Sequence, residues 1–444
     1  MTKLFTKLVL LIISIFAIGR LFFLHPTFSD ENFYFNVAKN IAEDKTLYKD
    51  FFFAHPPFQV YALALFFKVF GASFLLGKIL MLIISSACVF LIYLISKELY
   101  DERTGFVASL IFLVTPAFIA FSTMGYGMWE TLFLVLFSTY LIVKNRLRLA
   151  GIVLVASVFF RYLALIYFPF LLMLLHLRKQ KLKNFLVYFF LPFGTLFILF
   201  ISLFGLDYVD QTISYHIFSK MSIESADKTQ YWGIGYFFFF LALLSAFVGY
   251  TKWDKILLLL ASTPLIADLL ILAGLRIVFY HYFLISLTFC TMAVGRVFFT
   301  SKDLIVRTFI PIVLFLSLVS NIKTIDFYLN PVYAEKFYYI AEFVRNKTSE
   351  KDAIFGEPVM TNYVAFVSRR RISSNYLDSY LQHLTFEGEK NVIDRLKKDM
   401  PKLLIEAENY YGSNPYFKDF VLNNYKLEKS IGGFPGYFIY SIKS

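Results

Sequence analysis

The sequence has few of the residues that build metal or disulfide sites. Its 444 residues include only two cysteines, Cys88 and Cys290, and each lies inside an apolar run. A buried cysteine usually acts as a small apolar side chain, and no CxxC pattern of a metal site is present. Charged residues make up only 17% of the chain, and we find no internal repeat and no low-complexity linker. These absences argue against a cysteine-based metal module and against a repeat protein.

The sequence is instead rich in apolar and aromatic side chains. Hydrophobic residues account for 58% and aromatic residues for 20%, and the mean hydropathy is +0.64. Soluble domains average about 45–50% apolar residues, whereas apolar runs of about 18 residues or more recur along this chain. The composition predicts a polytopic α-helical membrane protein.

The basic residues agree with this class. The formal net charge is +12, but much of the excess lies in short loops between apolar runs, where lysine and arginine mark the cytoplasmic side. We therefore predict no nucleic-acid partner. The apolar run 8–24 follows two lysines and precedes no small-residue cleavage site, so we predict a retained first span with the N-terminus inside.

Later apolar runs bring the prediction to about eleven crossings, and one of them is unusual. Residues 150–177 lie between basic loops at 144–148 and 178–183, which are both predicted to be cytoplasmic. The segment must then cross an even number of times, yet it is short for two full spans. We predict a hairpin of short helices that turns near Arg161, an arrangement tolerated where the turn lines a cavity or is covered by protein.

A polar stretch at 28–58 separates two long apolar runs. It carries Asp30 and Glu31 near one end and His55, followed by two prolines, near the other. Its mixture of Phe, Tyr and Ala with spaced charges is unlike a disordered segment, and long loops are often functional. We predict an ordered loop on the outer face, spanning 26–75 and including a short interfacial helix at 58–70 that ends at a glycine.

From Asn321 onward charged residues become frequent. Residues 333–345 have the pattern of an amphipathic helix. Short buried strands are predicted at 353–355 and 403–405, and a closing hairpin at 425–431 and 436–442. We predict two domains, a transmembrane domain at 1–320 and a small extracytoplasmic α/β domain at 321–444.

Charged residues at membrane depth usually mark function. Several are predicted to share the outer face although they come from separate segments: Arg20, Asp30, Glu31, His55, Glu130, Arg161, Arg276 and His281. A carboxylate can act as a general base on an acceptor hydroxyl, while arginine and histidine can stabilise the phosphate oxygens of a leaving group. This combination suits a lipid-phosphate-linked donor. For Arg20 we expect an interfacial anchor.

At these residues the chain resembles the GT-C superfamily of membrane glycosyltransferases, in the branch of the protein O-mannosyltransferases and the lipid A aminoarabinose transferase. The matching positions are Asp30-Glu31, Tyr34, Ala38, His55-Pro56-Pro57, Val69-Phe70-Gly71, Glu130, Arg161-Tyr162 and His281-Tyr282. The resemblance implies that Asp30 is the catalytic base and Glu130 a second acid. Two positions depart from the pattern, because His55 replaces a lysine and Glu130 replaces a frequent aspartate.

The predicted function is an inverting glycosyltransferase of the cell membrane that uses a polyprenyl-phosphate-linked sugar on the outer face. Asp30 and Glu130 are the predicted catalytic residues. The residues predicted to bind substrate are Glu31, Tyr34, His55, Arg161, Arg276, His281 and Tyr282. The acceptor is a protein, lipid or glycan, and membrane lipids surround the chain. No cofactor is predicted with certainty, and a divalent metal remains open.

Structural alternatives remain at several positions. Asp30 could instead cap a helix, and Asp268, deep in an apolar run, is expected to pair with a neighbouring helix rather than carry protons. A transporter or lipid flippase is the alternative from another class, although such proteins usually show repeated halves. An enzyme that has lost activity and only binds a lipid-linked sugar is a third possibility.

Overall fold

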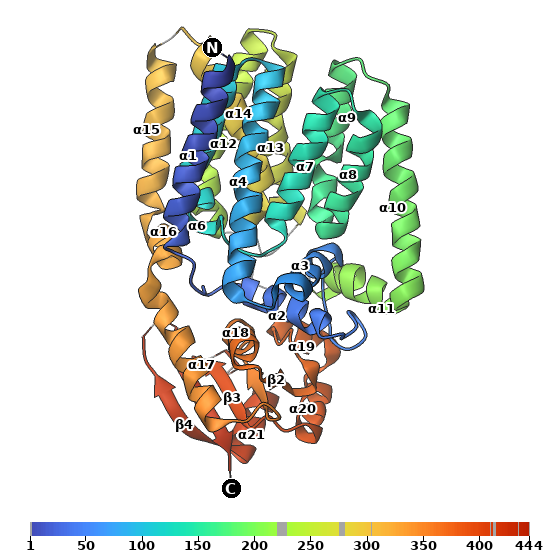
Figure 1. Ribbon diagram of the computed structural model, residues 1–444, viewed down its shortest axis with the longest axis vertical. Helices are drawn as coiled ribbons and strands as arrows, with labels where there is room; N and C mark the ends of the chain where they lie inside the picture. Colours follow the sequence, from blue (N-terminus) through green and yellow to red (C-terminus); the bar gives the residue numbers. More distant parts are fainter. Residues whose placement is uncertain are drawn as a thin grey trace. The chain divides into compact units, whose positions relative to one another are not determined.

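The computed structural model describes residues 2–219, 229–274, 280–302, 304–408, 410, 411, 414–433 and 435–443. The chain divides into two compact units, and each is assembled from segments far apart in sequence (Figure 1). The first unit comprises Met1–Leu24, Lys78–Leu199 and Glu224–Leu329. The second comprises His25–Gly77, Phe200–Ile223 and Asn330–Ser444.

The first unit is built from helices. In chain order these are α1 (Thr2–Leu21), α4 (Phe74–Leu99, which begins in the second unit), α5 (Glu102–Leu113), α6 (Pro116–Phe121), α7 (Met128–Val143), α8 (Leu147–Phe160), η1 (Tyr162–Tyr167), α9 (Phe168–Leu177), α10 (Leu182–Phe204, which ends in the second unit), α12 (Thr229–Thr251), α13 (Lys255–Gly274), η4 (Tyr280–Phe283), α14 (Leu284–Thr300), α15 (Leu304–Ser320) and α16 (Ile322–Leu329).

Several of these helices are long and apolar enough to cross a membrane. Among the described residues there are five such helices, or six if α15 and α16, which bend by 54° at their junction, form one span. Shorter apolar helices accompany them, including α7 and α8. The chain is therefore a multi-pass membrane protein.

Helices α7 and α8 pack closely, as Figure 1 shows. Two serine hydroxyls tie them together, since Ser138 donates to the Ala150 carbonyl at 2.9 Å and Ser157 donates to the Thr131 carbonyl at 3.1 Å. Such hydrogen bonds and small residues hold helices together where lipid supplies no hydrophobic driving force. This pair fixes the elements that carry two of the predicted site residues.

The predicted break near Arg161 is confirmed. Helix α8 ends at Phe160, and Arg161 has extended backbone angles, with φ −152° and ψ 127°. The chain resumes as the 3-10 helix η1 and then as α9. Pro169 lies in the first turn of α9, where a missing N–H leaves no hydrogen bond unmade. If α8 and α9 were one continuous helix, the same proline would interrupt its hydrogen bonds.

The second unit joins the polar stretch 28–58 to the C-terminal part of the chain. Its elements are α2 (Glu31–Ala42), α3 (Phe58–Phe70), α11 (Leu206–Val209), η2 (Asp210–Ser219), η5 (Pro331–Ala334), α17 (Glu335–Lys347), β1 (Ala353–Gly356), α18 (Pro358–Ser368), β2 (Arg371–Ile372), η6 (Ser373–Asn375), α19 (Leu381–Glu387), α20 (Glu389–Lys398), β3 (Leu403–Ala407), α21 (Pro415–Asn424), β4 (Tyr425–Ile431) and β5 (Tyr437–Ile442). The helix predicted at 58–70 is confirmed, with Gly71 at its end.

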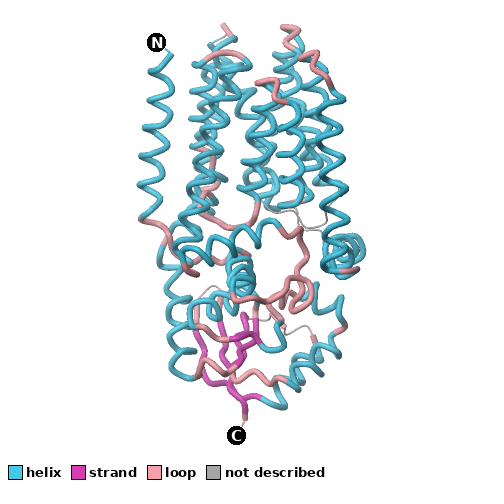
Figure 2. Tube along the Cα trace, turned by 45° about the vertical axis from the view of Figure 1, so that its right-hand side comes forward, coloured by secondary structure: helices cyan, strands magenta, loops and turns pink. Residues whose placement is uncertain are grey.

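The strands form one mixed five-stranded sheet in the order β2-β1-β3-β5-β4, drawn in magenta in Figure 2. β1 pairs in parallel with β2 and β3, while β5 pairs antiparallel with β3 and β4. The predicted strands and closing hairpin are thereby confirmed. The amphipathic helix is also confirmed, because α17 buries the predicted apolar face of Phe337, Ile340, Ala341 and Val344.

Helix α2 packs on α18 through one polar face. Asn32, Asn36 and Lys39 donate to acceptors on α18 at 3.1, 2.9 and 3.2 Å. Their spacing places them on one side of a helix. Farther along, Gln211 of η2 accepts from the Phe53 N–H at 2.9 Å and donates to the Tyr48 carbonyl at 2.8 Å. The stretch 28–58 is therefore an ordered part of a folded unit, as predicted.

Candidate functional site

Asp30 occupies the N-cap position of α2, but its carboxylate accepts no capping hydrogen bond. Instead, Oδ1 of Asp30 accepts a 2.5 Å hydrogen bond from the hydroxyl of Tyr380. Among the described residues, none hydrogen-bonds to Oδ2. The alternative in which this side chain caps the helix is therefore wrong, and the carboxylate has one oxygen held and one available.

The other predicted residues of the loop lie in the same unit. Glu31 is fully buried and accepts a 2.6 Å hydrogen bond from the hydroxyl of Thr27. The rings of Tyr34 and His55 lie 5.7 Å apart, and the Tyr48 hydroxyl fixes the loop by donating to the His55 carbonyl at 2.6 Å. The fold thus brings Tyr34 and His55 together from the two ends of the loop.

Glu357 is a buried carboxyl that the sequence did not single out. It follows β1 and caps α18, accepting from the N–H groups of Val359 and Met360 at 3.0 and 2.8 Å. The hydroxyl of Tyr437 donates to the same carboxyl at 3.4 Å. Burial raises the pKa of Glu357 to about 7, and the charge of Asp30 adds to this rise. The two carboxyl groups are therefore close enough to interact electrostatically.

In the first unit, Arg161 and His281 meet at Tyr126. The guanidinium of Arg161 donates to the Tyr126 carbonyl through Nε at 2.9 Å and also through a terminal nitrogen. The Tyr126 ring stacks on His281, with centroids 4.6 Å apart, and Tyr282 lies edge-on to the imidazole at 4.7 Å. Three predicted residues are thus gathered around one that was not predicted.

Glu130 lies in the first turn of α7, close to this group. The helix starts after Gly127, whose φ of +75° suits glycine. The Glu130 side chain is 7% exposed, and no described residue hydrogen-bonds to its Oε2. Glu130 and the guanidinium of Arg161 are close enough to interact electrostatically. A buried acid beside a guanidinium can orient that guanidinium or exchange a proton.

Arg20 differs from its expected role. Its side chain is 4% exposed and donates to the hydroxyls of Ser122 and Thr123, each at 3.1 Å. Anchoring in lipid head groups is therefore wrong for this residue. Arg20 holds the segment that leads to Tyr126.

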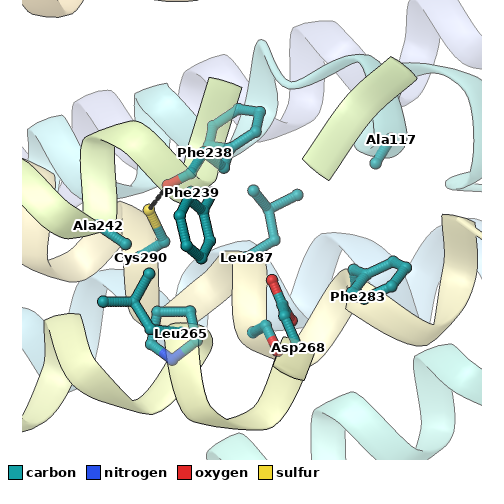
Figure 3. A pocket seen from close by; sticks show the side chains of 11 residues that line it. Ala117, Phe238, Phe239, Ala242, Leu265, Asp268, Phe283, Leu287 and Cys290 are labelled. Carbon is teal, nitrogen blue, oxygen red and sulfur yellow. Dashed lines mark hydrogen bonds between the residues drawn. The ribbon is translucent and has the colours of Figure 1, made fainter. Parts of the chain in front are cut away.

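Asp268, on α13, faces a small pocket of the first unit (Figure 3). Apolar side chains from α6, α12, α13 and α14 line most of this pocket. The carboxyl is 7% exposed and lies close to Ser286 of α14, whose hydroxyl is 2.7 Å from that of Tyr167. The expected pairing with a neighbouring helix is confirmed. Cys290 lines the same pocket, and both cysteines are free and buried, also as predicted.

Two predictions remain, one for Arg276 and one for a divalent metal. Arg276 lies outside the described residues, so its role stays a prediction. For the metal that the sequence left open, the described residues contain no group of three or more His, Cys, Asp and Glu side chains that could hold an ion.

The residues of the candidate site that sequence reasoning missed are Tyr380, Glu357 and Tyr126. Two come from the C-terminal part, where the sequence offers many tyrosines and acids without a distinguishing pattern. Tyr126 lies four residues before Glu130, so its position beside a predicted acid was a usable signal.

Comparisons with known proteins agree with this fold. Residues 54–204 match the family model of the dolichyl-phosphate-mannose-protein mannosyltransferases. No curated protein matches the sequence. Among solved structures, ArnT from Cupriavidus metallidurans bound to undecaprenyl phosphate matches with a TM-score of 0.62 at 10% identity, covering 99% of this chain and 98% of ArnT.

The archaeal oligosaccharyltransferase AglB from Archaeoglobus fulgidus, in complex with an inhibitory peptide and a dolichol-phosphate, matches with a TM-score of 0.53 at 14% identity. That match covers 100% of this chain and 75% of AglB. Together the matches define the class: the chain has the fold of the GT-C membrane glycosyltransferases. Within this class, the matched segment is similar to the mannosyltransferase family, as the sequence resemblance implied.

Proposed function

We propose that this chain is an inverting glycosyltransferase that moves a sugar from a polyprenyl-phosphate donor to an acceptor on the outer face of the membrane. The observation that carries the proposal is the hydrogen bonding of the Asp30 carboxylate. The sequence resemblance implies that Asp30 is the base; its carboxylate does not cap α2 and is held through one oxygen by Tyr380.

The donor class is supported by what the similar proteins bind. The ArnT structure contains undecaprenyl phosphate and the AglB structure contains a dolichol-phosphate. The matched family is named for dolichyl-phosphate-mannose. A polyprenyl phosphate is common to all three.

In the proposed reaction, Asp30 removes the proton of the acceptor hydroxyl as its oxygen attacks the anomeric carbon. The bond between that carbon and the phosphate oxygen breaks on the opposite side, and its electron pair leaves with the lipid phosphate. The transition state has oxocarbenium character, as in other glycosyl transfers. The configuration at the anomeric carbon is inverted.

The cationic residues have the complementary role of stabilising the leaving phosphate. Arg161 and His281 are held together through Tyr126, and Glu130 is close enough to the guanidinium to interact with it electrostatically. We assign phosphate binding to this group and to Arg276, with His55 contributing from the loop. For Glu31, Tyr34 and Tyr282, a part in substrate binding stays a prediction from the sequence. The segment 1–320 supplies the membrane part, and 321–444 is extracytoplasmic.

A transfer assay tests the function. The purified protein is placed in proteoliposomes with a polyprenyl-phosphate sugar labelled in the sugar, and a membrane extract supplies acceptors. Transfer moves the label from the lipid fraction to the acceptor and releases polyprenyl phosphate. If the labelled lipid instead crosses the bilayer chemically unchanged, the chain is a flippase and the proposal is wrong.

A further inference from the structure

The contact between Tyr380 and Asp30 joins residues 350 positions apart in the chain, at 2.5 Å. Tyr380 immediately precedes α19, and its ring lies edge-on to Phe33 of α2, with centroids 6.3 Å apart. The phenol therefore reaches the carboxylate from the C-terminal part of the same compact unit.

The backbone next to Tyr380 is fixed by contacts that do not involve Asp30. The hydroxyls of Ser379 and Tyr411 both donate to the Gly356 carbonyl, at 2.6 and 2.8 Å, and the Tyr411 hydroxyl also lies 3.3 Å from the Ser379 carbonyl. Gly356 has a φ of +153°, and a Cβ there would lie 1.9 Å from the Ile405 carbonyl oxygen. Only glycine fits this junction, so the position of Tyr380 is set by the sheet.

The phenol faces Asp30 as a neutral donor. Burial raises the pKa of Tyr380 well above its ordinary value, and the negative charges of Asp30 and Glu357 raise it further. The hydroxyl therefore keeps its proton at neutral pH. A hydrogen bond to an ionised group is stronger than one between neutral groups and fixes the geometry of both partners.

We propose that Tyr380 is a positioning residue for the base: it occupies Oδ1 of Asp30 and leaves Oδ2 as the oxygen that takes the proton of the acceptor hydroxyl. This inference rests on the proposed glycosyl transfer. During the reaction the acceptor proton passes to Oδ2 as the new carbon–oxygen bond forms and the phosphate leaves with the electron pair of the broken bond. Tyr380 keeps its own proton throughout.

The test compares Tyr380→Phe with Tyr376→Phe. Tyr376 is a matched control, because its hydroxyl also donates to a carboxylate of the same part of the chain, Glu387, at 2.9 Å. Both changes remove one hydroxyl and keep the ring. We expect Tyr380→Phe to lower kcat about ten- to a hundredfold, the usual value of a hydrogen bond to a charged group, with the donor KM within about twofold.

A double-mutant cycle separates positioning from a structural effect. In an Asp30→Asn background, loss of the Tyr380 hydroxyl is expected to change kcat little. Tyr376→Phe is expected to keep the wild-type kcat, and any drop in unfolding temperature should be similar in the two tyrosine variants. Equal losses in the two tyrosine variants, or a full additional loss in the Asp30→Asn background, would overturn the inference.

Failure of this inference and failure of the proposed function give different results. If Asp30→Asn is inactive and Tyr380→Phe has wild-type kcat, the positioning role is wrong and the transferase remains. If both variants transfer sugar at the wild-type rate, the assignment of Asp30 as base is also wrong. If the wild-type protein itself transfers no sugar, the proposed function is wrong.

Discussion

The ring of Tyr126 stacks on the imidazole of His281 at 4.6 Å, while its backbone carbonyl accepts hydrogen bonds from Arg161. One residue therefore holds two candidate phosphate ligands from distant parts of the chain. The two contacts use different atoms of Tyr126, so substitution of the side chain changes one and leaves the other.

Replacing Tyr126 by alanine should weaken donor binding. The stacked pair contributes about 0.5–1.5 kcal/mol, which corresponds to an increase in the donor Kd of about two- to tenfold. Tyr126→Phe keeps the stacked ring and should bind the donor as the wild type does. Titration with a polyprenyl-phosphate sugar in detergent measures both variants. Equal weakening in the alanine and phenylalanine variants would contradict the stacking role.

Arg161→Ala should weaken donor binding and also destabilise the first unit. Truncating one partner of a desolvated charge pair costs about 2–5 kcal/mol, much of it from the charge left unpaired. Here the acid that would lose the nearby positive charge is Glu130, which is 7% exposed. Adding Glu130→Gln to Arg161→Ala should therefore restore part of the lost Tm but none of the donor affinity. Recovery of both properties would mean that Arg161 acts only through Glu130.

Glu357 predicts a pH dependence of stability. Its pKa is about 7 in the folded protein and 4.5 ordinarily, so between these values the folded state binds more protons than the unfolded state. The free energy of unfolding then falls as pH rises from 4.5 to 7, by about 3 kcal/mol for this group. Glu357→Gln removes this decrease.

His383 has the opposite effect and serves as the control. It stacks on Phe52 with centroids 3.7 Å apart, and burial lowers its pKa to about 4 from 6.5. Between these values the unfolded state binds more protons, so the free energy of unfolding rises with pH. Thermal unfolding measured from pH 4.5 to 6.5 tests both groups. In Glu357→Gln the stability should rise more steeply with pH than in the wild type, and in His383→Asn it should fall with pH. Identical slopes in the two variants would contradict both assignments.

Sequence patterns predicted local features well because those features depend on neighbouring residues. The buried face of α17 follows from helical periodicity, and the end of α3 follows from Gly71. The break at Arg161 was predicted from charge and length, and Pro169 supports it.

The contacts of the candidate site depended instead on tertiary folding. Nothing near Asp30 in the sequence indicates that Tyr380 approaches it, because 350 residues separate them. In the sequence, Glu357 resembles any acid at the end of a strand. Only the structure shows that α18 starts there and that the side chain is buried at the end of β1. The motif predicts a role for Asp30 itself, whereas its partner Tyr380 follows only from the sheet that places Ser379 and Gly356 together.

The hairpin of α8 and α9 predicts a topology. The basic loops at 144–148 and 178–183 should both face the cytoplasm, because lysine and arginine mark that side. Single cysteines placed in each loop are expected to resist an impermeant thiol reagent added outside. A cysteine placed in the tail after residue 330 should react and is the positive control. Labelling of one basic loop but not the other would contradict the even number of crossings.

The central claim is that Asp30 is the base of a glycosyl transfer, and Asp30→Asn tests it most directly. Asparagine has the same size and caps a helix about as well as aspartate, but it cannot take a proton. Transfer from a labelled polyprenyl-phosphate sugar is measured under single-turnover conditions, with donor binding measured on the same sample. The account predicts a rate about 10²–10⁴-fold lower with donor binding nearly unchanged. Transfer at the wild-type rate would contradict it.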